Sequence, residues 1–245
     1  MSQNLFDNSE FFEKYKALRD KAYNYNNLVE QPAIKALLPD LSGLKVLDLG
    51  CGFGSNCTDF MKRGAAHVVG VDISSKMIDV AKKENAGSAI EYSVMDMMDI
   101  PKLSHTFDLI FSSLAIHYVK DFAHLVKIIY EKLNPGGILL FSQEHPITTA
   151  PKFGPVWTKD DAGNRLYYNL ADYMVSGERH VYWFIDGVEK YHRPLSEILN
   201  TLISTGFRIE KVVEPLPSQD ALEKRPELAD EFHKTSCIII KAIKD

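Results

Sequence analysis

The sequence contains few cysteines. Its 245 residues include only Cys51, Cys57 and Cys237, and none of these stands in the CxxC spacing of a metal site. Three cysteines cannot build a disulfide framework, so we expect a reducing compartment, the cytoplasm. The N-terminus lacks the basic start and apolar stretch of a signal peptide. No uncharged apolar run approaches the ~18 residues of a membrane span, so we expect no membrane partner.

The chain also lacks an excess of basic residues. Its 28 lysines and arginines are outnumbered by 33 aspartates and glutamates, which gives a net charge of −5. Because a protein that lives on nucleic acid needs a basic face, we expect no nucleic-acid partner. The fractions of apolar residues, 45%, and charged residues, 25%, are typical of a globular protein. The length fits one large domain or one domain with an insertion.

Short apolar strands alternate with helices along most of the chain. Residues 9–38 have helical spacing of their apolar side chains. Strands are expected at 45–49, 67–72, 90–94, 107–113, 137–143, 206–214 and 235–243, and further helices at 55–63, 75–84, 121–133 and 194–205. Strands that alternate with helices form a parallel sheet that is covered on both faces. The sequence therefore predicts the α/β class with a doubly wound, mostly parallel sheet.

Residues 144–193 interrupt this alternation. The segment is rich in aromatic residues, and Asp186-Gly187 between two apolar stretches predicts the turn of a β-hairpin. An aromatic insertion before the last helix of such a sheet is either a lid over a pocket or an extra structural flap. We interpret it as a lid inserted after the fifth strand.

A glycine-rich loop follows the first strand, in VLDLGCGFGSN at residues 46–56. Gly50 and Gly52 permit backbone angles that are forbidden to other residues and let a ligand approach the main chain. The glycines form G-x-G-x-G rather than the G-x-G-x-x-G of dinucleotide-binding proteins. The carboxylate of Asp48 would repel a pyrophosphate but suits an ammonium group. Both details favour a nucleoside that carries an amino acid over NAD.

Two more carboxylates follow the next strands. Asp72 ends the second strand, 24 residues after Asp48, where it can accept hydrogen bonds from both hydroxyls of a ribose. Asp96 follows the third strand. A glycine loop with carboxylates at three successive strand ends is much stronger evidence for a nucleoside site than the loop alone.

With these motifs, the chain resembles the class I S-adenosylmethionine-dependent methyltransferases. Within that family it is most similar to the small-molecule enzymes grouped with ubiquinone and menaquinone biosynthesis. VLDLGCGFG matches the family's first motif, and the resemblance is strongest over residues 28–143. It implies a seven-stranded Rossmann-like methyltransferase fold, S-adenosylmethionine as cofactor, and methyl transfer to a small molecule. The implied single domain comprises an N-terminal helical cap (1–43), a cofactor-binding core (44–143), an inserted substrate lid (144–193), and a final helix with strands (194–245).

The resemblance also implies the residues that bind the cofactor. Met77 would pack on the adenine, Asp96 would accept from its amino group, and the backbone N–H of Met97 would face a ring nitrogen. Tyr15 and Arg19 lie four residues apart on one helical face, where they could cover the methionine chain and pair with its carboxylate. Alternatively, Arg19 is solvated and Tyr15 belongs to the core. The full set is Tyr15, Arg19, Asp48, Gly50, Cys51, Gly52, Asp72, Ile73, Met77, Asp96, Met97 and Ser113.

Catalytic residues are harder to predict, because methyl transfer from a sulfonium depends mainly on alignment and on exclusion of water. A general base is needed only if the acceptor must lose a proton. His117, His145 and His192 are candidates, since they follow strands or lie near the lid, and Glu144 is a fourth. Residues in such positions are more often capping or packing residues than bases. The acidic metal triad of catechol-type enzymes is not evident, so we expect no metal.

Two other functions stay open at this point. The glycine loop and Asp72 are compatible with an NAD(P)-dependent oxidoreductase, although the early third glycine and Asp48 count against it. A non-catalytic protein that binds S-adenosylmethionine is also possible, because no residue type is obligatory for the transfer. The polar stretch 215–234 has no predicted role.

Overall fold

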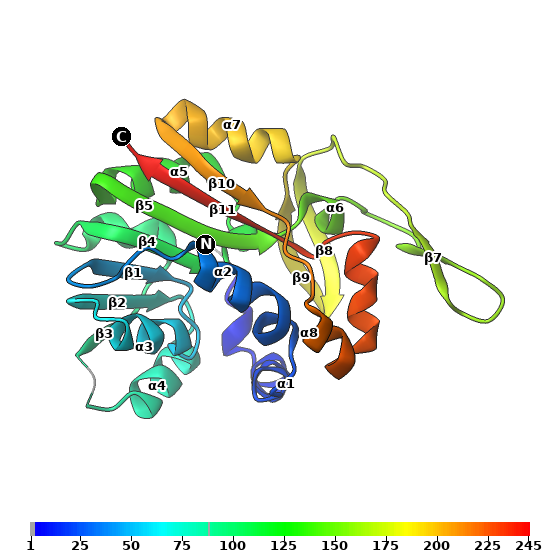
Figure 1. The fold of residues 1–245 in the computed structure, drawn as a ribbon, viewed down its shortest axis with the longest axis horizontal. Helices are drawn as coiled ribbons and strands as arrows, with labels where there is room; N and C mark the ends of the chain where they lie inside the picture. The colour runs from blue at the N-terminus through cyan, green and yellow to red at the C-terminus, as the bar shows by residue number, and fades with distance from the viewer. Residues whose placement is uncertain (1–2, 88) are drawn as a thin grey trace.

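The computed structural model describes residues 3–87 and 89–245 and is built around a seven-stranded sheet (Figure 1). The strand order is β10-β11-β5-β4-β1-β2-β3. Strands β1 to β5 run parallel to one another, and β11 is antiparallel to both β5 and β10. The predicted doubly wound, mostly parallel sheet with a hairpin ending is therefore confirmed. Its strands are β1 (Lys45–Leu49), β2 (His67–Asp72), β3 (Ile90–Val94), β4 (Phe107–Ser113), β5 (Leu133–Glu144), β10 (Phe207–Val213) and β11 (Cys237–Lys244).

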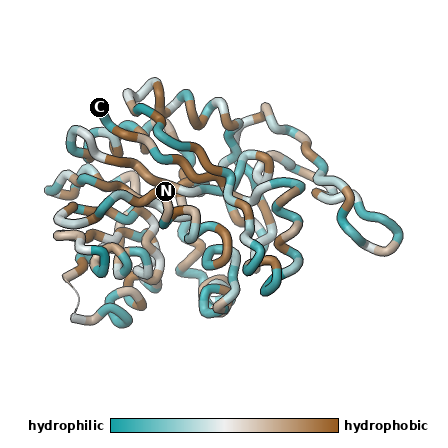
Figure 2. The backbone as a smooth tube through the Cα atoms, viewed as in Figure 1, coloured by the Kyte–Doolittle hydropathy of each residue, from teal (hydrophilic) through white to brown (hydrophobic). Residues whose placement is uncertain are grey.

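Helices cover both faces of the sheet, and the alternation of side chains along β1 accounts for the two layers. Leu47 packs in an apolar cluster with residues of α5 and α7, whereas Val46 packs in a second cluster with α2, α3 and α4. Accordingly, the most hydrophobic residues lie in the central strands (Figure 2). These helices are α2 (Gln31–Leu37), α3 (Ser55–Lys62), α4 (Ser75–Glu84), α5 (Phe122–Lys132) and α7 (Leu195–Thr205).

Local sequence signals fix where these helices begin. The side chain of Ser74 accepts from the backbone N–H of Met77 to start α4, and Asp121 caps α5 in the same way. The N-terminal segment predicted as helical over 9–38 contains three helices. They are α1 (Ser9–Arg19), the π-helical η2 (Asn26–Glu30) and α2, preceded by the short η1 (Leu5–Asp7).

The segment between β5 and α7 contains two hairpins. The first, β6 (Trp157–Lys159) with β7 (Arg165–Tyr168), projects from the body of the molecule (Figure 1). The second pairs β8 (Gly177–Trp183) with β9 (Ile185–His192). Its turn is at Phe184, with φ +64°, so the turn predicted at Asp186-Gly187 was wrong and those residues lie inside β9.

Packing of the hairpin tip explains the position of this turn. The ring centroid of Phe11 in α1 lies 5.2 Å from that of Trp183 and 5.6 Å from that of Phe184. Packing of Trp183 and Phe184 against the buried Phe11 outweighs the local turn preference of Asp-Gly. The hairpin and the N-terminal helices therefore meet at one aromatic cluster.

The polar stretch 215–234 forms two short helices, α8 (Gln219–Lys224) and η5 (Pro226–Phe232). Ala221 and Leu228 bury Val29 of η2, and the hydroxyl of Tyr25 donates to Glu231 at 3.2 Å. This stretch thus supports the π-helical turn that precedes α2. Within the described residues, no helix has both the length and the apolar character needed to cross a lipid bilayer.

Candidate active site

Two adjoining pockets lie at the carboxyl ends of β1, β2, β3 and β4. We call them the strand-end pocket and the helix-side pocket. The strand-end pocket is lined by Asp72, Ile73, Met77, Asp96 and Met97, among others, and the helix-side pocket by Arg19, Cys51, Ser55, His117, Glu144 and Trp183, among others. Both are lined by Phe6, Tyr15, Gly50, Gly52, Ser113, Leu114 and Tyr118, so they form one continuous cleft. The strand order reverses between β1 and β4, which is where ligands bind in open α/β sheets.

The glycine loop after β1 presents bare main chain to this cleft. Gly50 and Gly52 have φ values of +73° and +54°. The backbone N–H groups of Gly50 and Cys51 donate to the carbonyl of Val71 at 2.8 and 3.0 Å, which holds the loop against β2. A Cβ added at Gly52 would meet no atom within 4 Å. The open space beside Gly52 fits a ligand that lies directly against the backbone.

The carboxylate of Asp72 ends β2 at the floor of the strand-end pocket. One oxygen accepts the backbone N–H of Gly52 and the other that of Ser74, both at 2.9 Å. Each oxygen therefore keeps a lone pair for a ligand hydroxyl. Burial raises the pKa of Asp72 to about 6.

Asp48 lies beneath the loop and does not line either pocket. It shares a face of β1 with Val46, so its side chain points into the layer of α3. One carboxylate oxygen accepts from the thiol of Cys57 at 3.3 Å, and the other has no hydrogen-bond partner among the described residues. Burial raises the pKa of Asp48 to about 7. The expectation that Asp48 faces a ligand ammonium finds no support in this geometry.

Asp48 gives a prediction for pH-dependent stability. Its pKa is raised from 3.8, so the folded chain binds this proton more tightly than the unfolded chain, and the free energy of unfolding falls as pH rises from about 4 to about 7. Each unit of the pKa difference corresponds to about 1.4 kcal/mol. Asp48→Asn should reduce this loss of stability, measured by urea unfolding at about pH 5 and about pH 8. An equal loss in wild type and variant would contradict the assignment.

Glu30 is a buried carboxylate that sequence reasoning missed. It ends η2, is fully buried, and accepts from the hydroxyl of Ser113 at 2.6 Å and from the hydroxyl of Ser142. The side-chain amides of Asn26 and Gln31 donate to its other oxygen at 3.0 and 3.2 Å. In the described residues no cation lies within ion-pair distance of Glu30. It therefore places a negative charge directly behind Ser113, at the middle of the cleft.

The N-terminal segment covers the cleft. The carboxylate of Asp7 accepts from the hydroxyl of Ser74 at 2.6 Å and from the backbone N–H of Lys76 at 3.2 Å, which ties η1 to the start of α4. This attachment brings Tyr15 to both pockets and Arg19 to the helix-side pocket. Of the cofactor residues implied by the sequence, only Asp48 lies outside the cleft.

The candidate bases differ in position. His117 lines the helix-side pocket, where its Nδ1 accepts the backbone N–H of Glu144 at 3.4 Å, and burial lowers its pKa to about 4. Glu144 lines the same pocket. Neither His145 nor His192 lines either pocket.

Both ring nitrogens of these two distant histidines have protein partners. His145 accepts from the backbone N–H of Ile147 and contacts Glu214 at 2.8 Å. His192 contacts the hydroxyl of Thr149 and the carbonyl of Tyr173, both at 2.8 Å. The geometry therefore supports capping and packing for these two residues, and leaves His117 and Glu144 at the cleft.

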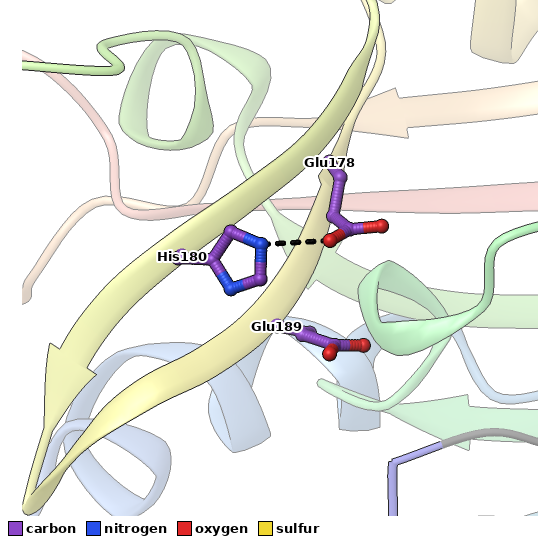
Figure 3. Close-up of side chains that lie close together, drawn as sticks. All are labelled: Glu178, His180 and Glu189. Atoms are coloured by element: carbon purple, nitrogen blue, oxygen red, sulfur yellow. Dashed lines mark ion pairs between the residues drawn. The ribbon is translucent and has the colours of Figure 1, made fainter.

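One group of side chains outside the cleft has the composition of a metal site. Glu178, His180 and Glu189 lie on the outer face of the β8–β9 hairpin (Figure 3), with their ligand atoms within 4.8 Å of one another. His180 already pairs with Glu178 at 2.7 Å. None of the three lines the cleft, so the cluster is not connected with the chemistry there.

Comparisons with known proteins agree with this geometry. A model of the methyltransferase domain family matches residues 47–141. The crystal structure of an S-adenosylmethionine-dependent methyltransferase from Mesorhizobium loti is 40% identical, covers 92% of this chain and 99% of that chain, and has a TM-score of 0.80. An uncharacterized protein of Haemophilus influenzae is 38% identical over 98% of this chain and 96% of its own length. The trans-aconitate 2-methyltransferase of Deinococcus radiodurans is 31% identical over 49% of this chain and 46% of its own length.

The sheet order and these relatives decide between the cofactors considered. The order, with an antiparallel last strand beside β5, is the one found in methyltransferases with a Rossmann-like fold. The Mesorhizobium loti and Deinococcus radiodurans relatives are methyltransferases rather than NAD(P)-dependent oxidoreductases. The chain belongs to the class I S-adenosylmethionine-dependent methyltransferases, and S-adenosylmethionine is its cofactor.

Proposed function

We propose that this enzyme methylates a small molecule that binds in the helix-side pocket beneath the β8–β9 hairpin. The observation that carries the proposal is the continuous cleft, which runs from the carboxylates at the ends of β2 and β3 to Glu144 and Trp183. A trans-aconitate methyltransferase among the relatives supports a small acceptor. The resemblance to enzymes grouped with ubiquinone and menaquinone biosynthesis also supports a small acceptor, and we include this subtype in the proposal.

We assign the adenosine to the strand-end pocket. Asp72 accepts from the ribose hydroxyls, since both of its oxygens lie at the pocket floor with capacity to spare. Asp96 and Met97 face the adenine edge, and Met77 packs on its ring. The methionine part extends past Gly52 towards Tyr15 and Arg19, where the guanidinium can pair with the carboxylate.

The cofactor supplies a methyl group on a positively charged sulfonium, and transfer is an in-line displacement. The protein holds the reacting atoms in position and keeps water away from them. Tyr15, Tyr118 and Trp183 surround the middle of the cleft and exclude water from the reacting atoms. We interpret residues 144–193 as the lid that holds the acceptor in line, and residues 1–43 as the cap over the cofactor.

The buried charge of Glu30 predicts selective binding of the charged cofactor. In Glu30→Gln the negative charge behind Ser113 is lost while the size and shape of the side chain are kept. We expect affinity for S-adenosylmethionine to fall roughly 5–20-fold, and affinity for neutral S-adenosylhomocysteine to change less than about 3-fold. Calorimetric titration of both ligands measures the ratio. An equal fall for both would show that Glu30 acts only through the fold.

Turnover tests the proposed function itself. The purified protein is incubated with S-adenosylmethionine and the small-molecule fraction of an ultrafiltered cell extract, and S-adenosylhomocysteine formation is followed. We expect formation that depends on the extract. Tight cofactor binding without any turnover would instead favour a non-catalytic binding protein.

A further inference from the structure

The end of the cleft beneath the hairpin contains a buried cation on the lid. Lys190 of β9 is only 7% exposed and forms an ion pair with Glu144. Its ammonium group also lies 5.3 Å from the ring centroid of Trp183 and 6.0 Å from that of Tyr118, both of which line the helix-side pocket. A buried lysine is almost always paired, and Lys190 meets this condition through Glu144.

A second buried cation, Arg179, lies close to Lys190. Arg179, 3% exposed, lines a further pocket together with Lys190, Glu144 and Trp183, so that pocket is continuous with the cleft. Its guanidinium donates only to backbone carbonyls, at 2.7 to 3.3 Å. Within the described residues, no carboxylate lies at ion-pair distance from Arg179.

Arg193 adds a third buried cation. Its guanidinium donates to the carbonyls of Val119 and Lys120. No described carboxylate lies within ion-pair distance of it, but Glu197 and Asp121 act on it electrostatically from further away. The charged neighbours of His117 are accordingly one carboxylate, Glu144, and two cations, Lys190 and Arg193. Around His117 the cations thus outnumber the carboxylates, so an anion beside its ring would be stabilised.

His117 adds a neutral hydrogen-bond donor. Because its Nδ1 accepts the backbone N–H of Glu144, the ring proton is on Nε2. Burial lowers the pKa of His117 to about 4, so the ring is neutral near pH 7. His117 therefore can donate to an anion but cannot accept a proton through Nε2.

Among the described residues that line the helix-side pocket, none is a base suited to neutral pH. The neighbouring Lys190 lowers the pKa of Glu144, and burial raises the pKa of Tyr15, Tyr118 and Cys51. None of these groups is tuned to remove a proton from an alcohol or a phenol near pH 7. An acceptor that is already deprotonated needs no such group.

We propose that the acceptor is a small-molecule carboxylate, held by Lys190 and His117, and that the product is its methyl ester. This inference rests on the proposed function and specifies its acceptor. A carboxylate oxygen uses a lone pair to form the bond to the methyl carbon, while the carbon–sulfur bond breaks and its electrons stay on sulfur. The positive sulfonium and the negative carboxylate give neutral S-adenosylhomocysteine and a neutral ester, so no proton is released.

The product's stability to alkali tests the inference. The enzyme is incubated with methyl-labelled S-adenosylmethionine and a panel of aliphatic and aromatic carboxylic acids, each beside its primary amide, and with the small-molecule fraction of a cell extract. Esters release labelled methanol in mild alkali, whereas N-methyl, S-methyl and ether products do not. We expect alkali-labile label from one or more carboxylic acids and from the extract.

Matched variants on one strand test the role of Lys190. Lys190→Met should raise the KM for the carboxylate roughly 10–100-fold and leave cofactor affinity within about 2-fold, and Lys190→Arg should restore much of the loss. Glu189→Gln is the control, because Glu189 neighbours Lys190 on β9 but points to the outer face of the hairpin (Figure 3). It should behave as wild type.

The outcomes separate this inference from the proposed function. Label only in alkali-stable products, or full activity of Lys190→Met, would overturn the carboxylate assignment while the methyltransferase function stands. No product from the carboxylic acids or the extract, with cofactor binding intact, would also overturn it. Loss of cofactor binding by the wild-type protein would instead remove the proposed function.

Discussion

Replacing Asp72 with alanine is expected to weaken binding of both S-adenosylmethionine and S-adenosylhomocysteine by ~100-fold or more. Both ligands carry the same ribose, and a hydrogen bond to a charged group contributes about 1.5–3 kcal/mol. Two such bonds are lost together. The carboxylate also accepts the backbone N–H groups of Gly52 and Ser74, so the loop loses its support as well. Calorimetric titration of the two ligands measures the effect.

The control for Asp72→Ala is Asp72→Asn, which keeps one acceptor oxygen and should lose less affinity. Urea unfolding of both variants shows how much of the effect comes from the fold. Burial raises the pKa of Asp72 to about 6, so wild-type affinity should decline as pH falls below that value, and Asp72→Asn should not show this decline. Unchanged affinity in Asp72→Ala would remove Asp72 from the assigned ribose site.

The sequence was sufficient to predict that the residues proposed for the cofactor lie together at the strand ends. Strands buried on both faces appear as continuous apolar runs, so their ends are visible in the sequence. Parallel strands bring their carboxyl ends to one edge, which is why Gly52, Asp72 and Asp96 meet although they are far apart in the chain. Position in the sheet, rather than any local contact, made these residues predictable.

The parts that were missed depend on contacts between distant segments. Glu30 lies in a π-helical turn, and its partners Ser113 and Ser142 are on β4 and β5. The turn at Phe184 is determined by packing on Phe11 of α1. Neither relation leaves a periodic pattern in the sequence. The orientation of Asp48 differs from expectation because side chains alternate along a strand, and a strand buried on both faces does not reveal which residues face the ligand.

The two covers of the cleft are physically joined. Phe11 of α1 contacts Trp183 and Phe184 at the hairpin tip, and Tyr15 lies 6.0 Å from Trp183 between ring centroids. Opening either cover therefore disturbs the other. In the function we propose, the N-terminal helices cover the cofactor and the hairpin covers the acceptor, so this aromatic cluster would couple acceptor binding to closure over the cofactor.

Three glycines, Gly43, Gly50 and Gly52, share a left-handed backbone but differ in the space around them. Their alanine variants should therefore differ in stability. Gly43, Gly50 and Gly52 all have φ between +54° and +77°, so each alanine is strained by ~1 kcal/mol or more. A Cβ at Gly43 or Gly52 meets nothing within 4 Å, whereas one at Gly50 would lie 2.5 Å from the Cβ of Ala115. Gly50→Ala should therefore destabilise the protein most, by roughly 2–4 kcal/mol.

The affinities of the same three variants for S-adenosylmethionine should follow a different order from their stabilities. Gly43 lies before β1 and lines neither pocket, so Gly43→Ala should bind S-adenosylmethionine like wild type. Gly52→Ala should unfold at a similar urea concentration to Gly43→Ala yet lose affinity at least ~30-fold, because its methyl group would occupy the space that the ligand needs beside the backbone. Urea unfolding and calorimetry on the three variants measure both quantities. If Gly52→Ala bound the cofactor as tightly as Gly43→Ala, the ligand could not lie against the loop, and the assignment of the whole cleft would have to change.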